Sequence, residues 1–315
     1  MGVLYMCKRS KAKLVLAVLS MLLLSLAGLL NVNAAYTNSD WMGWISGSKS
    51  LTQLSIPGTH DSGALYEPIP GIAKCQNLTI TQQLNAGVRY LDIRCRHVNN
   101  EFAIHHGPIF QKMYFDDVLS ACIGFLNQNP TECIIMAIKP EHTESGNTRT
   151  FEETFNAYMS QNPDKWYTSS NIPILGLARG KIVLVRRFPA ATLPKGIDAT
   201  GWADNTTFVI NCGSNNIKIQ DEYVVPDNAQ KWALVQNMYN EAKNQNPTWL
   251  YINFTSGLKK HFGLIPSITT VSNYMNPKIE AWFTSNTEGR FGITVMDFAN
   301  QNRCSLIIKT NFPGR

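Results

Sequence analysis

Beyond its first 34 residues, this sequence has little excess of positive over negative charge. The 315 residues include 28 lysines and arginines and 22 aspartates and glutamates, a formal net charge of +6. Four of the basic residues lie in the first 34 positions, which hold no acidic residue, so the remainder carries 24 basic and 22 acidic residues. No basic run in the remainder exceeds two residues, and no stripe of arginines alternates with aromatic residues. We therefore expect no nucleic-acid partner.

The sequence also lacks a Cys-x-x-Cys pair, which removes the usual signature of a structural zinc site. Six cysteines follow position 34, and export from the cell would permit them to form disulfides. Their spacing alone does not decide between bridges and buried free thiols. They are Cys75, Cys95, Cys122, Cys133, Cys212 and Cys304.

Long apolar runs are absent except at the N-terminus. Residues 14–30 carry no charge, four basic residues precede them within positions 8–13, and Val32 and Ala34 have the spacing of a cleavage site. This pattern predicts a secretory signal peptide over residues 1–34 and a secreted mature protein. The alternative is an uncleaved membrane anchor, because the run is only slightly shorter than a standard membrane span.

No linker rich in glycine, serine or proline and no internal repeat divides residues 35–315, so we expect a single domain there. Five helix-like stretches, at 79–86, 115–127, 150–161, 228–244 and 270–285, fall between short apolar segments that are typical of buried strands. About eight such strands covered by helices predict an α/β fold with a mainly parallel sheet, a distorted or incomplete TIM barrel. The strand-like segments are LTQLSIP, VRYLDIRC, EFAIHHG, ECIIMAIKP, KIVLVRRF, TTFVIN, WLYINFTS and FGITVMDF.

Charged side chains and imidazoles follow six of these strands, where barrel enzymes build their sites. In SIPGTHDSGA, Pro57-Gly58 predicts a turn that leaves His60 and Asp61 on a loop after the first strand. Two imidazoles on different strands suit a general base and a general acid, and arginine matches a phosphate group. Of His105 and His106 only one can face the barrel mouth, since neighbouring strand residues point to opposite faces. The other strand-end groups are Asp92, Arg94, Lys139, Glu141, Arg186, Arg187 and Asp297.

These segments, in this order, resemble the bacterial phosphatidylinositol-specific phospholipase C family. The resemblance runs from about Trp44 to Asn300 and includes IQDEY and LYINFTS in the second half. It implies an incomplete TIM barrel and cleavage of phosphatidylinositol, with glycosyl-phosphatidylinositol anchors as possible further substrates. The products would be diacylglycerol and inositol 1,2-cyclic phosphate, formed by attack of the inositol 2-hydroxyl on phosphorus. The alternatives are a related barrel phosphodiesterase for another lipid headgroup and a non-catalytic lipid-binding module.

The resemblance also implies roles for individual residues. His60 is the implied general base, oriented by Asp297, and His106, rather than His105, is the implied general acid assisted by Asp61. Arg94, beside Asp92, would activate the phosphate, and the implied inositol-binding residues are Lys139, Glu141, Arg187, Asp221 and Tyr223. Simpler roles stay open: Asp92 could be structural, Lys139 and Arg187 could be surface charges, and Tyr223 could belong to the core.

Two further expectations concern metals and membranes. Calcium-dependent relatives carry a second carboxylate where this sequence has Arg94, so the resemblance implies a metal-independent enzyme without a cofactor. Its partner would be phosphatidylinositol in a membrane surface, and nothing in the sequence indicates a protein partner. Apolar residues beside Lys259 and Lys260 and in EPIPGIAK would contact that surface, unless they pack beneath their own loops. These candidates are Ile69, Ile72, Phe262, Leu264 and Ile265.

Overall fold

The computed structural model describes residues 36–212, 215–261 and 265–314, the side chains at 212, 215, 261 and 265 aside. By its internal contacts the chain divides into residues 1–37 and a compact unit, Asn38–Arg315, to which the following description applies. Among the described residues, no helix combines the length and the apolar character that crossing a membrane requires. Phe262 and Leu264, two of the residues expected at the membrane, lie outside the described part of the chain.

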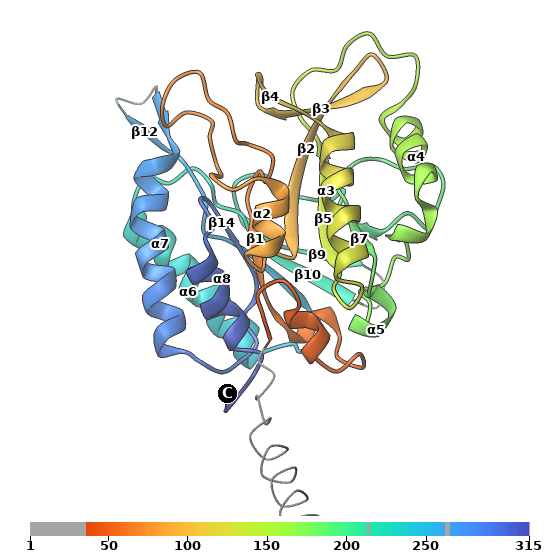
Figure 1. Ribbon diagram of the computed structural model, residues 1–315. Helices are drawn as coiled ribbons and strands as arrows, with labels where there is room; N and C mark the ends of the chain where they lie inside the picture. Colours follow the sequence, from red (N-terminus) through yellow and green to blue (C-terminus); the bar gives the residue numbers. More distant parts are fainter. Residues whose placement is uncertain (1–35, 213–214, 262–264, 315) are drawn as a thin grey trace, which may run out of the picture. The chain divides into compact units, whose positions relative to one another are not determined.

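One curled sheet forms the centre of the unit (Figure 1). Eight of its strands run parallel to their neighbours, and a ninth, β9, closes the series in the antiparallel direction. In spatial order these nine are β6 (Trp166–Tyr167), β7 (Ile182–Arg186), β5 (Ile134–Pro140), β2 (Tyr90–Val98), β1 (Ser55–Thr59), β14 (Gly292–Met296), β11 (Leu250–Phe254), β10 (Asn215–Gln220) and β9 (Thr207–Cys212).

The sheet does not close into a full barrel, because no ladder joins β6 to β9 among the described residues. The short strand β8 (Ile197–Asp198) shares the outer edge of β7 with β6. A hairpin of β3 (Glu101–His106) and β4 (Ile109–Tyr114) extends from β2 in antiparallel pairing. A separate two-stranded ribbon pairs β12 (Lys259–His261) with β13 (Ile265–Ser267). The result is an incomplete (β/α)8 barrel, as expected from the sequence.

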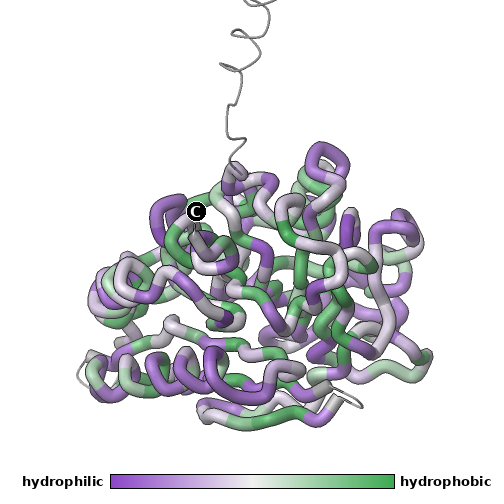
Figure 2. The backbone as a smooth tube through the Cα atoms, turned by 90° about the horizontal axis from the view of Figure 1, so that it is seen from below, coloured by the Kyte–Doolittle hydropathy of each residue, from purple (hydrophilic) through white to green (hydrophobic). Residues whose placement is uncertain are grey.

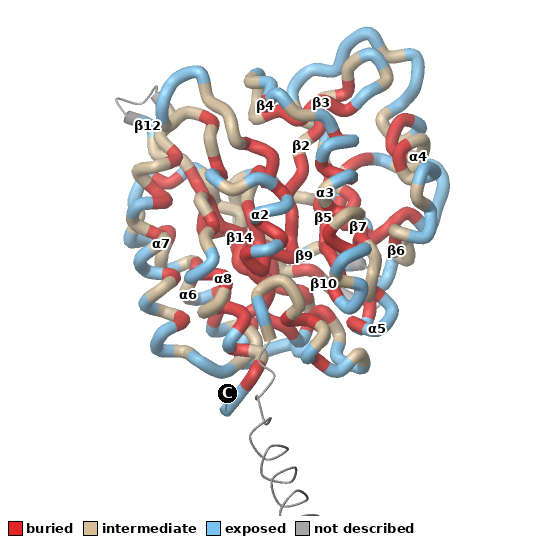
Figure 3. Tube along the Cα trace, in the orientation of Figure 1, coloured by how far each residue is buried: buried red, intermediate tan, exposed pale blue. Residues whose placement is uncertain are grey.

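Helices cover the outside of the sheet and expose their outer faces, while the central strands of the sheet are largely buried (Figure 3). Every residue of β1, β7, β11 and β14 is buried, which explains why their sequences read as continuous apolar runs rather than alternating ones. Figure 2 shows apolar segments running through the interior of the unit. The helices are α2 (Ile80–Asn85), α3 (Phe115–Gln128), α4 (Phe151–Gln161), α5 (Leu175–Ala178), α6 (Asn228–Asn244), α7 (Ile268–Ser285) and α8 (Gln301–Lys309), with 3-10 turns at Trp41–Trp44, Leu51–Gln53 and Pro163–Lys165.

Several local expectations were wrong. Pro57 and Gly58 lie inside β1 and do not form a turn, although His60 and Asp61 do follow the end of the strand. A side chain at Gly58 would come within 3.1 Å of Tyr90 and 3.2 Å of Ile293, so glycine is needed for close packing of β1 between its neighbours. The sequence patterns also did not predict α5, α8, the strand β10 or the shorter strands β4, β6, β8, β12 and β13.

The cysteine question is resolved for five of the six thiols. Cys75, Cys95, Cys122, Cys133 and Cys304 are buried and free. Away from the pocket these side chains act as small apolar groups in the core, and burial alone raises the pKa of the Cys122 thiol well above its usual value. The side chain of Cys212 lies outside the described part.

A buried ion pair fixes the end of the barrel where the strands begin. Arg89 and Glu132 are fully buried, and their side chains approach to 2.7 Å. Arg89 directly precedes β2, and Glu132 lies two residues before β5. The guanidinium also donates to the carbonyl oxygens of Leu84 and Ser39, and Glu132 accepts from the backbone N–H of Gly43. The pair therefore ties the N-terminal segment to the strands at the end opposite the charged strand ends.

We predict that Arg89→Met lowers the free energy of unfolding by about 3–5 kcal/mol, because it leaves the Glu132 carboxylate buried without its cation. Urea unfolding measures the loss. Arg89→Met combined with Glu132→Gln should recover part of it, and Lys218→Met, which removes a half-exposed pair with Glu241, should cost no more than about 1 kcal/mol. An Arg89→Met variant as stable as the Lys218→Met control would contradict the prediction.

Candidate active site

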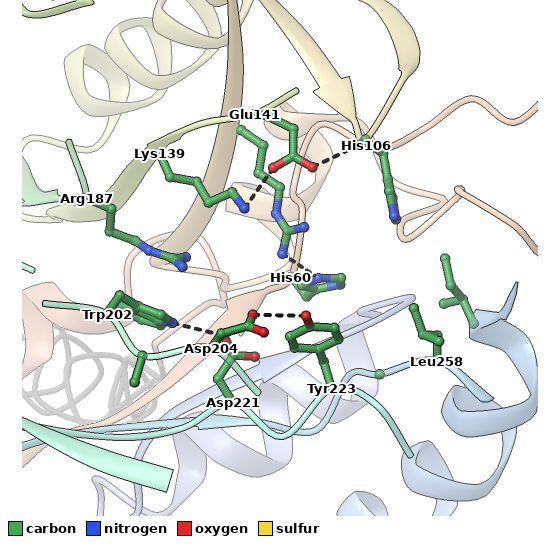
Figure 4. A pocket seen from close by; sticks show the side chains of 15 residues that line it. His60, His106, Lys139, Glu141, Arg187, Trp202, Asp204, Asp221, Tyr223 and Leu258 are labelled. Carbon is green, nitrogen blue, oxygen red and sulfur yellow. Dashed lines mark hydrogen bonds and ion pairs between the residues drawn. The ribbon is translucent and has the colours of Figure 1, made fainter. Parts of the chain in front are cut away.

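A pocket of about 360 Å³ opens at the carboxyl ends of the parallel strands (Figure 4). Parallel pairing brings the ends of β1, β2, β5, β7, β10 and β14 to one edge of the sheet, so residues far apart in the sequence meet there. The residues that line the pocket are His60, Arg94, His106, Gly107, Lys139, Glu141, Arg187, Trp202, Ala203, Asp204, Asp221, Tyr223, Gly257, Leu258 and Ile268.

His60 and Asp297 follow the neighbouring strands β1 and β14 and form a histidine–carboxylate pair. His60 Nδ1 lies 2.8 Å from Asp297 Oδ1, and His60 Nε2 lies 2.7 Å from Arg94 Nη2. Since the guanidinium can only donate, Nε2 carries the lone pair and Nδ1 carries the proton in the neutral ring. Burial by itself lowers the pKa of His60, but the Asp297 carboxylate outweighs it and the pKa lies above the usual 6.5. The ring is therefore oriented as a base toward the pocket.

Asp92 anchors the positive charge of the pocket. Its Oδ2 lies 3.1 Å from Arg94 Nη2 and 3.2 Å from Arg94 Nε, and its Oδ1 lies 3.7 Å from Arg187 Nη1. Burial of the carboxyl group would raise its pKa, but the two guanidinium groups hold the pKa of Asp92 well below its usual range. The carboxylate thus stays charged and holds both arginines in place. Asp92 therefore supports the pocket from behind, although it does not line it.

His106 and Asp61 form a second pair on the other side of Arg94. His106 Nδ1 lies 3.2 Å from Asp61 Oδ2, and the rings of His60 and His106 have centroids 6.5 Å apart. Burial raises the pKa of Asp61 to about 7, while burial and Arg94 lower the pKa of His106 to about 4. Below pH 7 the free protein therefore keeps one proton on this pair, and it lies mainly on the carboxyl group.

The opposite wall of the pocket is lined by groups suited to a polyhydroxylated ligand. Lys139 pairs with Glu141 at 2.8 Å, and the Arg187 guanidinium lies 3.8 Å from the ring centroid of Trp202. Trp202 donates to Asp221 at 3.0 Å. The Tyr223 hydroxyl donates to Asp204 at 2.9 Å. These side-chain donors and acceptors surround an open space beside the rings of Trp202 and Tyr223.

The structure brings the sequence-predicted residues together. Eight of them line the pocket, and Asp61, Asp92 and Asp297 lie directly behind it. His105 is 4% exposed and packs against Phe110 and His142, away from the pocket, whereas His106 lines it. Arg186 is buried in a pair with Asp198. The roles of all these residues remain predictions.

Sequence reasoning missed Trp202, Asp204 and Cys75. Trp202 and Asp204 lie in the loop between β8 and β9, whose sequence has no periodic pattern that would indicate their place in the pocket. Cys75 is fully buried and its Sγ lies 3.5 Å from His106 Nδ1. Two sets of side chains in the described part could hold a metal ion, and both include this thiol: His60, Cys75 and Asp297, and Asp61, Cys75 and His106.

Two of the predicted membrane contacts, Ile69 and Ile72, belong to one described loop. Ile69 is 60% exposed, and Ile72 is half-buried. The backbone N–H of Ile268, which follows β13, donates to the carbonyl of Gly71 at 3.0 Å, so the loop carrying Ile69 lies beside the β12–β13 ribbon (Figure 1). Ile265 begins β13, and its side chain is outside the described part.

Comparison with known proteins agrees with this geometry. Residues 51–188 match the family model described as phosphatidylinositol-specific phospholipase C, X domain. The chain is 35% identical over 276 residues to a 1-phosphatidylinositol phosphodiesterase of Staphylococcus aureus (strain Newman), covering 82% of this chain and 88% of that protein. It is 31% identical over 298 residues to a 1-phosphatidylinositol phosphodiesterase of Listeria monocytogenes serovar 1/2a, covering 89% and 87%.

Solved structures give the same result. A mutant of the phosphatidylinositol-specific phospholipase C from S. aureus matches with a TM-score of 0.80 and 33% identity, covering 87% of this chain and 97% of that one. The enzyme from L. monocytogenes matches with a TM-score of 0.73 and 29% identity, covering 87% and 99%. Sequence, fold and pocket therefore agree that the chain belongs to the bacterial phosphatidylinositol-specific phospholipase C family.

Proposed function

We propose that this protein is a phospholipase C that cleaves phosphatidylinositol into diacylglycerol and inositol 1,2-cyclic phosphate. The observation that carries the proposal is the pair of imidazoles, His60 and His106, with the Arg94 guanidinium between them in one pocket. The relatives from S. aureus and L. monocytogenes, named 1-phosphatidylinositol phosphodiesterases, support the substrate.

In this mechanism His60 Nε2 takes the proton of the inositol 2-hydroxyl. The oxygen attacks phosphorus, and Arg94 stabilises the negative charge that grows on the phosphoryl oxygens. The bond to the glycerol oxygen breaks, and that oxygen takes the proton held by His106 and Asp61. The entering phosphate raises the affinity of this pair for its proton, since a nearby negative charge favours the protonated state. Slow hydrolysis of the cyclic phosphate uses the same groups in reverse.

Inositol would occupy the opposite wall of the pocket. Asp221 and Glu141 would accept hydrogen bonds from the inositol hydroxyl groups. Lys139 and Arg187 would donate hydrogen bonds to them, and the Tyr223 ring would stack on the inositol ring. Trp202 and Asp204 extend this set, because each is hydrogen-bonded to one of its members. Arg94 supplies the positive charge at phosphorus that a metal ion provides in other phosphodiesterases.

We further propose that residues 1–34 are a signal peptide and that the secreted enzyme works from the surface of a membrane. Ile69 on the exposed loop and the neighbouring Lys259 and Lys260 of β12 support this, because apolar groups beside lysines suit an anionic surface. A solved structure of the S. aureus enzyme that concerns modulation of its membrane binding is consistent with such a surface.

The assignment of base and acid is tested by substitution. His60→Ala and His106→Ala should each lower turnover of phosphatidylinositol at least ~10²-fold, because each removes a proton-transfer group. His105→Ala, the matched control, should lower stability more than turnover, since that ring packs away from the pocket. Phosphorus NMR follows the cyclic phosphate. Near-normal turnover by a folded His60→Ala protein would refute the assignment.

The pH dependence tests the role of Asp297. The base must be neutral, so kcat/KM of the wild type should fall as the pH drops through the pKa of His60, which the carboxylate raises above 6.5. Asp297→Asn removes the cause that raises it, so this acidic limb should move to lower pH while kcat falls at least ~10²-fold. Asp204→Asn should alter KM and leave the limb in place. An unmoved limb in Asp297→Asn would show that another group is titrating.

Membrane binding is tested with Ile69. Ile69→Ser should weaken binding to phosphatidylinositol-containing vesicles about tenfold, because each buried CH₂ contributes ~0.8 kcal/mol of membrane affinity. Hydrolysis of soluble inositol cyclic phosphate should stay unchanged. Leu177→Ser is the control, since Leu177 is 58% exposed but lies on α5, which precedes the start of β7. Equal vesicle binding by both variants would locate the contact elsewhere.

A further inference from the structure

Cys75 has a position that the proposed mechanism does not use. Its side chain is fully buried, and its Sγ lies 3.5 Å from His106 Nδ1 at the edge of the pocket. The residue is held firmly, because its backbone N–H donates to Ala64 O at 2.9 Å and its carbonyl accepts from the N–H of Phe298 at 2.7 Å. A rigid thiol beside an imidazole and a carboxylate is a set of ligands for a soft or borderline cation.

We propose that Asp61, Cys75 and His106 form a binding site for a thiophilic divalent cation such as Zn²⁺. The three ligand atoms all lie within 4.8 Å of one another. Asp61 Oδ2 is 3.2 Å from His106 Nδ1, and Cys75 Sγ is 3.5 Å from the same nitrogen. A tetrahedral zinc ion with bonds of ~2.0–2.2 Å to nitrogen and oxygen and ~2.3 Å to sulfur needs spacings of about 3.3 and 3.6 Å. Two of the three ligand spacings therefore nearly match those that the ion requires, and the third, from Asp61 to Cys75, is below 4.8 Å.

Asp61 provides a second, independent reason. The residue is fully buried, and its Oδ2 lies 3.2 Å from His106 Nδ1 and 3.8 Å from Arg94 Nε. Within the described part of the chain, neither carboxylate oxygen has a hydrogen bond of good geometry. A buried carboxylate without such bonds is costly, and a bound cation would satisfy it. On binding, the S–H bond of Cys75 breaks and a sulfur–zinc bond forms. The thiol proton and the proton that the Asp61–His106 pair holds below pH 7 both pass to the solvent. The thiolate and the carboxylate then balance both charges of the ion.

The alternative set, His60, Cys75 and Asp297, fits less well. His60 Nδ1 and Asp297 Oδ1 are only 2.8 Å apart, which is a hydrogen-bond distance and shorter than the ~3.3 Å between two ligands of a tetrahedral ion. The other ring nitrogen of His60 already contacts Arg94 at 2.7 Å. Calcium and magnesium prefer shells of oxygen ligands, so the thiol favours zinc over both.

Occupancy should inhibit the enzyme. The ion would bind Nδ1 of His106 and the carboxylate of Asp61, the two groups that hold the proton for the leaving glycerol oxygen. This consequence rests on the proposed function, whereas the binding itself does not. Zinc would thus be an inhibitor, and a chelator used alone should not lower turnover.

The binding test uses the whole chain, treated with EDTA and then desalted. Equilibrium dialysis should find one Zn²⁺ per chain at micromolar concentration, and Co²⁺ at the same site should give a thiolate-to-metal charge-transfer absorption. Cys75→Ser should weaken zinc binding at least ~100-fold and abolish the absorption, since the sulfur ligand is lost. Cys122→Ser removes a buried thiol of α3 outside the set and should keep both signals. Circular dichroism checks that each variant is folded, and Cys75→Ala serves as a second variant.

Activity is then measured as a fraction of each variant's own metal-free rate. Zinc should inhibit the wild type and Cys122→Ser but not Cys75→Ser, and EDTA should reverse the inhibition. Absence of micromolar zinc binding, or binding that survives the loss of Cys75, would overturn the site while leaving the proposed function intact. Binding of zinc at Cys75 without inhibition would overturn the inhibitory effect and would contradict the roles proposed for Asp61 and His106.

Discussion

The buried charge of Asp92 is the constraint on which the arrangement of the pocket depends. A carboxylate in the interior is tolerated only with close cationic or hydrogen-bonding partners, and Asp92 has Arg94, Arg187 and the backbone N–H of Asp61. Asp92, on β2, thereby orients the guanidinium of Arg94 on its own strand, that of Arg187 just after β7, and the loop that follows β1. Arg94 in turn contacts His60, so the position of the base also depends on Asp92.

The two histidines differ because their surroundings differ. His60 has a fixed carboxylate partner in Asp297, which raises its pKa, whereas the partner of His106 is Asp61, a group so buried that its own pKa is raised to about 7. Two imidazoles within one pocket are thus prepared for opposite tasks, one to receive a proton and one to pass a proton on. The same burial that makes Asp61 a proton holder also leaves its oxygens short of hydrogen bonds.

Much of the site could be predicted because its parts obey a regular geometry. The strands are buried on both faces and read as apolar runs, and parallel strands end at one edge, so His60, Arg94 and Asp297 had to converge. Local rules failed where tertiary packing overrides them, as in the Pro57-Gly58 pair, which packing between β2 and β14 keeps extended. Nothing in the pattern could reveal Trp202, which lies on an irregular loop, or Cys75, whose neighbours come from distant segments.

The pocket has two parts that the fold holds in place in different ways. Arg94, Lys139 and Asp297 are fixed by strands whose register is set by hydrogen bonds to both neighbours, whereas Trp202 and Asp204 belong to the loop between β8 and β9. A change in that loop alters no ladder of the sheet. Headgroup preference can therefore diverge during evolution through changes in the length and composition of the loop between β8 and β9. The positions of the proton-transfer groups stay the same, because the strands hold them.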